Sequence, residues 1–309
     1  MGVESSLIII TLRRAALLRN TLEALTRQTR PLSEIVVIDN GPDAETERVA
    51  GSFRARLPIR CVAEPRRGYG VARNRGLAEA RGEVLYFLDD DCVAEPDWAE
   101  TLWSAVASGR ADLAGGSRVS GRTGLAARLE YLSTDGPVLS PQLPGGPARH
   151  LSTSNLVLSR EVVGRTGPFD ETLAMCEDRD FTVRARERGF RLLYEPRAQV
   201  THYSSVERMA QYLGRMRHYG LGTSQYFARR PQESLARFFP RHPAARLMLL
   251  PVLAAAGTAY LIRGNLPHGL DAVPLGPLLF VGQLWWHWGG FEAMRLERGG
   301  SNRRYNQTA

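Results

Sequence analysis

Short runs of apolar residues alternate with amphipathic segments along the first 205 residues of the chain. Residues 7–11 and 35–39 are rich in Ile, Val and Leu, as in strands buried on both faces of a parallel sheet, and a third strand is expected at 59–63. The segments between these runs have the spacing of helices. This alternation predicts right-handed βαβ units and an α/β fold in which helices flank a mostly parallel central sheet.

A fourth apolar run, residues 86–88, leads directly into three acids, Asp89, Asp90 and Asp91. Adjacent carboxylates repel one another, so such a cluster needs water, a cation or cationic side chains around it. Because ligands of α/β sheets bind beyond the carboxyl ends of the strands, Thr11, Asp39 and the acidic triplet should lie along one edge. A solvated turn or a helix N-terminus is the alternative interpretation of the triplet.

A loop rich in arginine and glycine, residues 64–76, precedes this fourth run. Its glycines would let the backbone approach a ligand, its arginines could hold a diphosphate, and a helix that begins near Val71 would point its free amides outward. The spacing matches neither GxGxxG nor a P-loop, which disfavours a Rossmann dinucleotide site and a Walker NTPase. A solvated helix face would have a similar composition.

Together these segments resemble the inverting family 2 glycosyltransferases, which have the GT-A (nucleotide-diphospho-sugar transferase) fold. The resemblance implies that Thr11 and Asp39 hold the nucleotide base and that the acidic triplet is the DxD motif. Asp91 would then bind the metal, Asp89 would be a further metal ligand or face the donor ribose or a metal-bound water, and Asp90 would be structural or touch the donor. The other donor-binding residues implied by the resemblance are Arg14, Arg67, Gly70, Arg73 and Asn74.

The resemblance extends to about residue 205. A strand expected within 151–160 and a turn at 167–171 would border the active centre, and Glu177 and Asp178 match the acidic ED motif that supplies the base. Asp178 is the first candidate for the base and Glu177 the second, although acids in a first helical turn also follow from capping and the helix dipole. Asn155 and Arg179 are expected on the acceptor side. Residues 134–149, rich in Gly and Pro, would be either an acceptor-side loop or a surface excursion.

Glycosyl transfer with inversion needs a carboxylate that takes the proton of the acceptor hydroxyl on the face opposite the leaving diphosphate. A divalent cation on Asp91 would neutralise that leaving group as a Lewis acid. Oxygen ligands suit Mg²⁺ or Mn²⁺, and His202 as a further ligand would favour Mn²⁺. Since Asp39 can accept a hydrogen bond from the imide N–H of uracil or thymine, a UDP- or dTDP-sugar is favoured over a GDP-sugar.

Beyond residue 205 the pattern becomes helical. Residues 206–230 are amphipathic and rich in arginine, and two uncharged or nearly uncharged stretches of 16 and 19 residues follow at 247–262 and 273–291. Both are short or interrupted for a membrane span, but flanking arginines and a tryptophan cluster are typical of interfacial anchoring. Membrane contact through residues 245–295, by span or by surface insertion, is therefore favoured over a helical hairpin that packs on protein.

The sequence pattern and the resemblance predict a catalytic domain (1–205), a helical region with possible membrane association (206–297) and a polar, disordered tail (298–309). The net charge is +8, but all 40 basic residues are arginine, which indicates a compositional bias. No nucleic-acid motif accompanies the charge, so no nucleic-acid partner is expected. Cys61, Cys92 and Cys176 lack CxxC spacing and indicate reduced thiols, and no signal-peptide pattern is present. A cytoplasmic protein at the cytoplasmic face of the membrane is expected.

The sequence thus predicts a metal-dependent, inverting glycosyltransferase of the hexosyltransferase type. It would move a sugar from a nucleotide-diphosphate donor to the hydroxyl of a glycan or lipid-linked acceptor, in the synthesis of cell-envelope polysaccharide, glycolipid or a related glycoconjugate. The alternative is a non-catalytic nucleotide-sugar-binding or membrane-scaffold protein with the same fold. A nucleotidyltransferase of similar topology is disfavoured because the glycine-rich loop typical of that class does not follow the first strand.

Overall fold

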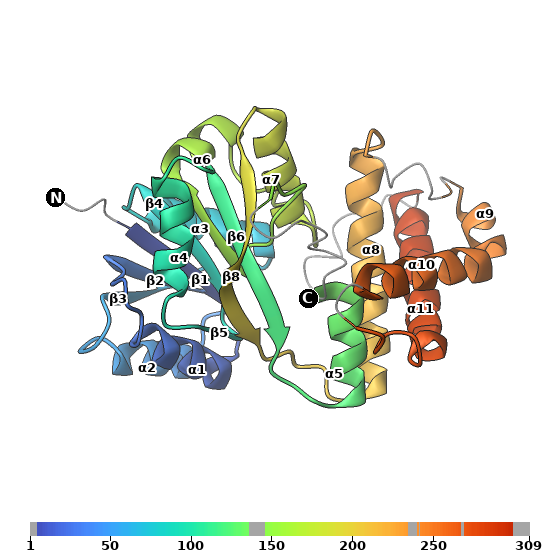
Figure 1. The fold of residues 1–309 in the computed structure, drawn as a ribbon, viewed down its shortest axis with the longest axis horizontal. Helices are drawn as coiled ribbons and strands as arrows, with labels where there is room; N and C mark the ends of the chain where they lie inside the picture. Colours follow the sequence, from blue (N-terminus) through green and yellow to red (C-terminus); the bar gives the residue numbers. More distant parts are fainter. Residues whose placement is uncertain (1–4, 136–145, 234–239, 241, 267–268, 299–309) are drawn as a thin grey trace.

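A computed structural model describes residues 5–135, 146–233, 240, 242–266 and 269–298 (Figure 1). Most of the expected acceptor-side loop at 134–149 and nearly all of the expected tail at 298–309 lie outside these residues. In Figure 1 a sheet with its covering helices forms one half of the molecule, and the helices that follow residue 208, together with a short helix at 125–130, form the other half.

Within the described residues, eight strands form one mixed sheet in the order β3-β2-β1-β4-β7-β6-β8-β5. Neighbours run parallel from β3 to β4 and between β6 and β8, whereas β7 is antiparallel to both β4 and β6, and β5 is antiparallel to β8. The α/β fold is confirmed. The strands are β1 (Ser5–Thr11), β2 (Glu34–Asp39), β3 (Ile59–Ala63), β4 (Val84–Asp89), β5 (Cys92–Ala94), β6 (Leu113–Ser120), β7 (Asn155–Ser159) and β8 (Leu192–His202).

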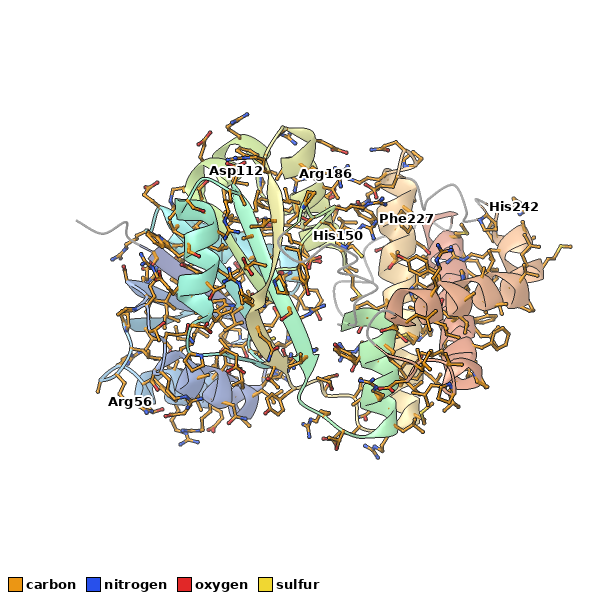
Figure 2. The ribbon with its side chains drawn as sticks, in the orientation of Figure 1. Arg56, Asp112, His150, Arg186, Phe227 and His242 are labelled. Carbon is orange, nitrogen blue, oxygen red and sulfur yellow. The ribbon has the colours of Figure 1, made fainter. Side chains whose placement is uncertain are left out.

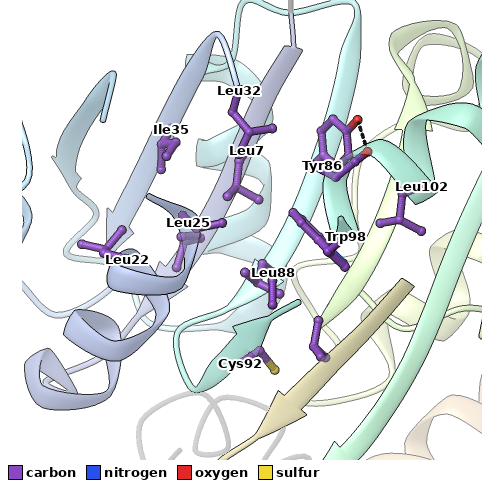
Figure 3. Packing of buried hydrophobic residues seen from close by; sticks show 14 of the residues in the cluster. Leu7, Leu22, Leu25, Leu32, Ile35, Tyr86, Leu88, Cys92, Trp98 and Leu102 are labelled. Carbon is purple, nitrogen blue, oxygen red and sulfur yellow. Dashed lines mark hydrogen bonds between the residues drawn. The ribbon is translucent and has the colours of Figure 1, made fainter. Parts of the chain in front are cut away.

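Helices cover the sheet because each buries one apolar stripe on it. On α1, Leu18, Leu22 and Leu25 are buried against the sheet core. In the same cluster, Trp98 and Tyr86 are fully buried, and the Tyr86 hydroxyl donates a hydrogen bond of 3.1 Å to the Ala99 carbonyl (Figure 3). The helices of this half are α1 (Ala15–Leu25), α2 (Ala44–Ser52), α3 (Tyr69–Glu79), α4 (Trp98–Ala107), α6 (Arg160–Thr166) and α7 (Glu177–Glu187). Helix α5 (Leu125–Glu130) and the π-helical turn η1 (Tyr131–Asp135) belong to the other half, where α5 lies beside the helix that begins at Met209 (Figure 1).

The strand register sets the edge at which a ligand can bind. Thr11 pairs with Asp39 across β1 and β2, and Ile10 pairs with Asp89 across β1 and β4. The carboxyl ends of these parallel strands therefore meet, and the expectation that Thr11, Asp39 and the acidic triplet share one edge is confirmed.

The second half also contains α8 (Met209–Arg229), α9 (Pro243–Met248), α10 (Leu250–Asn265) and α11 (Gly276–Arg298). Helices α8 and α11 touch backbone to backbone, since a Cβ on Gly220 would lie 1.7 Å from the Trp286 carbonyl oxygen and one on Gly289 would lie 1.9 Å from that of Arg217. Five buried residues of this half form one cluster with α5 and η1, namely Tyr212, Met216, Leu261, Ala272 and Leu279. The helical-hairpin alternative therefore describes the packing of these segments.

No helix in the described part of the chain is long and apolar enough to cross a membrane. The expectation of a span at 247–262 or 273–291 is wrong for these helices. Helix α10 has 16 residues, about 24 Å at 1.5 Å per residue, against a hydrocarbon core of roughly 30 Å. Helix α11 is longer but carries Gln283, His287, Glu292 and Arg295 along its length.

Candidate active site

A cavity of about 1100 Å³ lies between the carboxyl edge of the sheet and the C-terminal helices. Figure 2 shows two of its lining residues, His150 and Phe227, at the boundary between the two halves. Among the described residues, the lining leaves out three predicted site residues, Asp39, Gly70 and Asn74. It includes the other twelve, Thr11, Arg14, Arg67, Arg73, Asp89, Asp90, Asp91, Asn155, Glu177, Asp178, Arg179 and His202.

Asp90 is the most enclosed member of the acidic triplet, with 2% of its surface exposed. The Thr11 hydroxyl donates a hydrogen bond of 2.6 Å to one carboxylate oxygen, and Arg14 Nη1 lies 2.9 Å from the other. Burial raises the pKa of Asp90 to about 7, although Arg14 opposes this shift. Both oxygens are used within the protein, which favours the structural role over the donor contact for Asp90.

Asp91 stands between two cationic or potentially cationic side chains. Arg14 pairs with one carboxylate oxygen, and His202 Nε2 lies 3.3 Å from the same atom. Burial alone would raise the pKa of Asp91, but His202 and Arg14 outweigh it and hold this pKa well below its usual range. Asp91 is therefore ionised at neutral pH.

Asp91 and His202 supply the two ligand types expected for a Mn²⁺ or Mg²⁺ ion. No cluster of three or more His, Cys, Asp or Glu side chains with metal-binding geometry occurs within the described residues. Asp89, the third predicted ligand, lies 3.6 Å from Arg73. Two protein ligands still fit such a cation, because Mg²⁺ is commonly held by one or two carboxylates together with water and substrate phosphates.

Arg73 and Glu177 form a buried ion pair between α3 and α7. Their side chains are 6% and 5% exposed, and Arg73 Nη1 contacts Glu177 Oε1. Burial raises the pKa of Glu177 to about 7, with Arg73 acting in the opposite direction. Because Glu177 is engaged in the protein interior, it is poorly placed to take a proton from an acceptor.

Asp178 has the freer carboxylate of the pair in the ED motif. It is half-buried and lines the cavity, and its oxygens accept hydrogen bonds from the backbone amides of Arg179 at 2.7 Å and Thr153 at 3.4 Å. Cys176, just before α7, has a left-handed backbone with a φ of 67°, which turns the chain sharply into the helix. This turn puts Glu177 inward and leaves Asp178 at the cavity wall.

Gly70 and Asn74 have a different place from the one predicted. The Asn74 side chain donates to the Phe169 carbonyl at 3.0 Å and accepts from the Phe169 amide at 2.9 Å. A Cβ on Gly70 would lie 2.8 Å from the Asp170 carbonyl oxygen. Both residues thus fix α3 to the turn at 167–171, and they position the site without facing the cavity.

Asn155 is also committed to the protein interior. Its Oδ1 accepts a hydrogen bond of 2.8 Å from Trp98 Nε1, and its Nδ2 donates to the carbonyls of Ser117 at 3.0 Å and Ala198 at 2.8 Å. These bonds tie β7 to α4, β6 and β8. The side-chain amide is therefore occupied within the protein, although Asn155 lines the cavity, and its place on the acceptor side stays a prediction.

Arg179 and Asp39 keep groups that a ligand could use. Arg179 pairs with Glu233 at 3.1 Å, lines the cavity, and has a buried Nε without a hydrogen-bond partner among the described residues. Asp39 accepts a bond of 2.9 Å from the Asp43 amide on Oδ2, whereas no described group bonds its buried Oδ1. Burial raises the pKa of Asp39. Asp39 itself does not line the cavity, although its neighbour Asn40 does, and an N–H donor that reached this oxygen would complete the Asp39 carboxyl.

Other lining residues lay outside the sequence predictions. Tyr69, at the start of α3, has its ring 5.7 Å from the Arg73 guanidinium, and His150 has a pKa lowered to about 4 by burial and by Arg179. Helices α8, α10 and α11 contribute a further group of lining side chains. Tyr69 lies within the loop at 64–76, whereas His150 and the helical residues belong to no recognisable motif, so the sequence carried no signal for them beyond helical spacing.

The sequence model of glycosyl transferase family 2 matches residues 6–165, just over half of the chain. The chain belongs to glycosyl transferase family 2. Glycosyltransferase AglE of Haloferax volcanii is 30% identical over 195 residues, which cover 61% of this chain and 63% of AglE. The chain thus spans less than two thirds of the length of this curated relative.

Solved structures share the fold at low sequence identity. The crystal structure of Staphylococcus aureus TarS 1–349 in complex with UDP-GlcNAc matches with a TM-score of 0.55 and 17% identity, over 96% of this chain and 92% of that one. The crystal structure of GalNAc-T7 with UDP, GalNAc and Mn²⁺ matches with a TM-score of 0.53 and 17% identity, over 75% of this chain and 51% of that one. These similarities confirm the predicted GT-A fold.

Proposed function

We propose that this protein is an inverting, metal-dependent glycosyltransferase that moves a sugar from a nucleotide-diphosphate donor to an acceptor hydroxyl. The observation that carries the proposal is the single cavity in which the acidic triplet on the sheet edge and Asp178 on α7 meet. Membership of glycosyl transferase family 2 supports it. Asp178 takes the proton of the acceptor hydroxyl while the nucleoside diphosphate leaves on the opposite side of the sugar.

The donor is a UDP- or dTDP-sugar, with a GDP-sugar as the less favoured option. The free carboxylate oxygen of Asp39 suits the imide N–H of uracil or thymine. TarS, a relative in fold, has been crystallised with UDP and with UDP-GlcNAc, which supports a uridine nucleotide. Arg67 and Arg73 line the cavity beside the triplet and provide positive charge for the diphosphate.

Asp91 and His202 would hold the divalent cation, Mn²⁺ or Mg²⁺. When bound, the cation would supply positive charge to the departing diphosphate as a Lewis acid. The structure of GalNAc-T7 with Mn²⁺ supports a cation in this fold. Arg14 shares the Asp91 carboxylate and orients it.

The acceptor is a glycan or a lipid-linked molecule of cell-envelope or related glycoconjugate synthesis. Residues 1–205 carry the donor site, and the helices of 206–297 add a surface for the cytoplasmic face of a membrane. Large apolar side chains stand exposed on these helices and the loop between them, with Met248 82%, Leu270 71% and Val252 63% exposed. Such a surface suits shallow insertion among lipid headgroups.

Donor hydrolysis tests the proposal. Turnover of UDP-sugars is measured with Mn²⁺ or Mg²⁺ for the wild type and for Asp178→Asn, Glu177→Gln and Asp91→Ala. General-base catalysis contributes roughly 10²- to 10⁴-fold, so Asp178→Asn should lose activity in that range. Asp97→Asn, which changes an exposed carboxylate, is the matched control and should keep full turnover.

Two results would contradict the proposal in different ways. Wild-type turnover by Asp178→Asn would move the base to another residue, with Glu177→Gln as the variant that then loses activity. Full turnover by Asp91→Ala would show that Asp91 does not hold a metal that the reaction needs. A thermal-shift comparison of UDP-, dTDP- and GDP-sugars identifies the donor base, because a ligand that binds the native state raises its apparent stability.

A further inference from the structure

The cavity continues from the carboxylates into a space walled by the three long C-terminal helices. Helix α10 lines it with Leu253, Ala256, Gly257, Tyr260 and Leu261, whose spacing of three and four residues defines one face of the helix. The chain therefore presents a continuous stripe of α10 to the same space that Asp178 faces. We call this part of the cavity the helical wing.

The facing walls of the helical wing are mainly apolar or aromatic. Helix α8 contributes Met216, Tyr219 and Phe227 together with Arg215 and Thr223, and α11 contributes Trp286 together with Gln283 and His287. The polar side chains of these walls are fewer than the apolar ones, so they could bond only some of the hydroxyls of an oligosaccharide, and the others would leave water without a partner. An apolar chain has no hydroxyls that need hydrogen bonds, and it would bury its own apolar surface against these walls.

The helical wing also opens at an apolar surface. Tyr260 lines the cavity and is nevertheless 49% exposed, so it stands at the opening. On the same helix, Val252 is 63% exposed, and Met248 of the preceding helix is 82% exposed. A chain that enters beside Tyr260 would therefore pass from one apolar environment to another.

The size of the cavity leaves room for two substrates. Its volume of about 1100 Å³ exceeds the roughly 300–1,000 Å³ of pockets that hold one small ligand. The donor is expected at the sheet edge, beside Asp89 and Arg67. The helical wing is the remaining part, and it reaches the cavity wall that carries Asp178.

We infer that the helical wing binds an apolar chain of the acceptor, so that the acceptor is a lipid-linked molecule whose hydroxyl is held near Asp178. This inference rests on the proposed glycosyltransferase function and narrows its acceptor class. The hydrocarbon chain lies between α8, α10 and α11, and the polar head lies toward the sheet edge.

Binding of n-alkyl β-glucosides from methyl to decyl, below their micelle concentrations and with UDP present, tests the inference by calorimetry. Each methylene that enters the helical wing should lower the Kd roughly fourfold, from about 0.8 kcal/mol per buried methylene, until the space is filled. Ala256→Trp fills the helical wing and should weaken binding of the octyl compound at least tenfold. Ala255→Trp, on the exposed neighbouring residue outside the described lining, is the matched control and should bind like the wild type.

Several outcomes overturn the inference. If the wild-type Kd does not change with chain length, the helical wing is not an apolar binding site. If Ala256→Trp and Ala255→Trp lose the same affinity for the octyl compound, the chain binds on the outer face of α10. Maltose oligosaccharides that bind tighter with each added sugar would make the helical wing a glycan site. Circular dichroism reports folding, and Leu253→Phe serves as a second filling variant with the same expected loss.

UDP binding separates this inference from the proposed function. A wild-type protein that binds neither UDP nor UDP-sugars refutes the glycosyltransferase proposal itself. A protein that binds UDP but shows no chain-length dependence refutes only the lipid-linked acceptor. Ala256→Trp should keep wild-type affinity for UDP, since Ala256 lies on α10 and the donor residues lie on the sheet edge.

Discussion

Substitution of Arg73 tests how strongly the stability of the protein depends on one buried cation beside Asp89 and Glu177. Arg73 contacts Glu177, lies 3.6 Å from Asp89, and has only 6% of its side chain exposed. Arg73→Ala would leave two carboxylates facing each other without this cation. Breaking a buried ion pair by removing one partner costs about 3–5 kcal/mol, because the remaining charge stays buried.

The loss should depend on pH in a defined direction. Burial raises the pKa of Glu177 to about 7 from its usual value of 4.5, so the folded state favours the neutral acid. The stability that this acid contributes is present below pH 4.5 and is lost as the pH rises to 7. Without Arg73 the charged form becomes still less favourable, so Arg73→Ala should be more destabilising at pH 8 than at pH 6.

Thermal unfolding at pH 6 and pH 8 measures both effects. At roughly 2 °C per kcal/mol for a chain of this size, Arg73→Ala should lower the Tm by about 6–10 °C at pH 8. Arg75→Ala is the matched control on the same helix, since Arg75 is 40% exposed and pairs with Glu79 at the surface. Exposed pairs contribute about 0–1 kcal/mol, so this variant should lose no more than roughly 2 °C.

The reasoning would be refuted if Arg73→Ala lost no more stability than Arg75→Ala, or if its loss were smaller at pH 8 than at pH 6. A double variant, Arg73→Ala with Glu177→Gln, provides a further check. It removes the negative charge that Arg73 compensates, so it should recover more than half of the lost Tm.

Three further predictions concern the framework of the site. Asn155→Ala should cost about 3–5 kcal/mol in urea unfolding, because it leaves three buried hydrogen-bonding groups without their partner. Burial lowers the pKa of His150 from 6.5 to about 4, so its contribution to stability is present above pH 6.5 and is lost as the pH falls toward 4, and His150→Gln should lack that loss in pH-dependent unfolding. Gly220→Ala should lower the Tm because its Cβ would meet the Trp286 carbonyl at 1.7 Å, whereas Gly214→Ala on the same helix, with nothing within 4 Å, should raise stability by about 0.5–1 kcal/mol. The explanation for Asn155 would be contradicted if Asn155→Ala were as stable as the wild type. The explanation for His150 would be contradicted if the wild type and His150→Gln unfolded identically in acid, and that for the glycines if Gly220→Ala and Gly214→Ala had equal effects.

The strand ends could be predicted because buried parallel strands have a strong sequence signal. Apolar runs fixed the strands that end at Thr11, Asp39 and Asp89, and the rule that ligands bind beyond strand ends brought these residues together. The roles of polar side chains could not be predicted in the same way. Asn74 bonds to Phe169, 95 residues away, and neither local spacing nor composition reveals a partner at that distance.

The C-terminal helices show a second limit of sequence patterns. An apolar helical stripe has the same appearance whether lipid or protein covers it, so residues 247–262 and 273–291 were compatible with both environments. The deciding features are glycines. Gly220 and Gly289 let α8 and α11 approach closely, and such contacts appear only when both helices are seen together.

The shared cluster between α5 and the C-terminal helices changes the meaning of the boundary near residue 205. Leu129 and Leu132, which precede that boundary, are 0% and 3% exposed because Tyr212 and Leu261 pack in the same cluster. A fragment that stopped at residue 205 would expose these leucines to water and would lose part of the wall around the carboxylates. Loss of the C-terminal helices as a whole, unlike a single substitution such as Ala256→Trp, should therefore destabilise the half that carries the carboxylates.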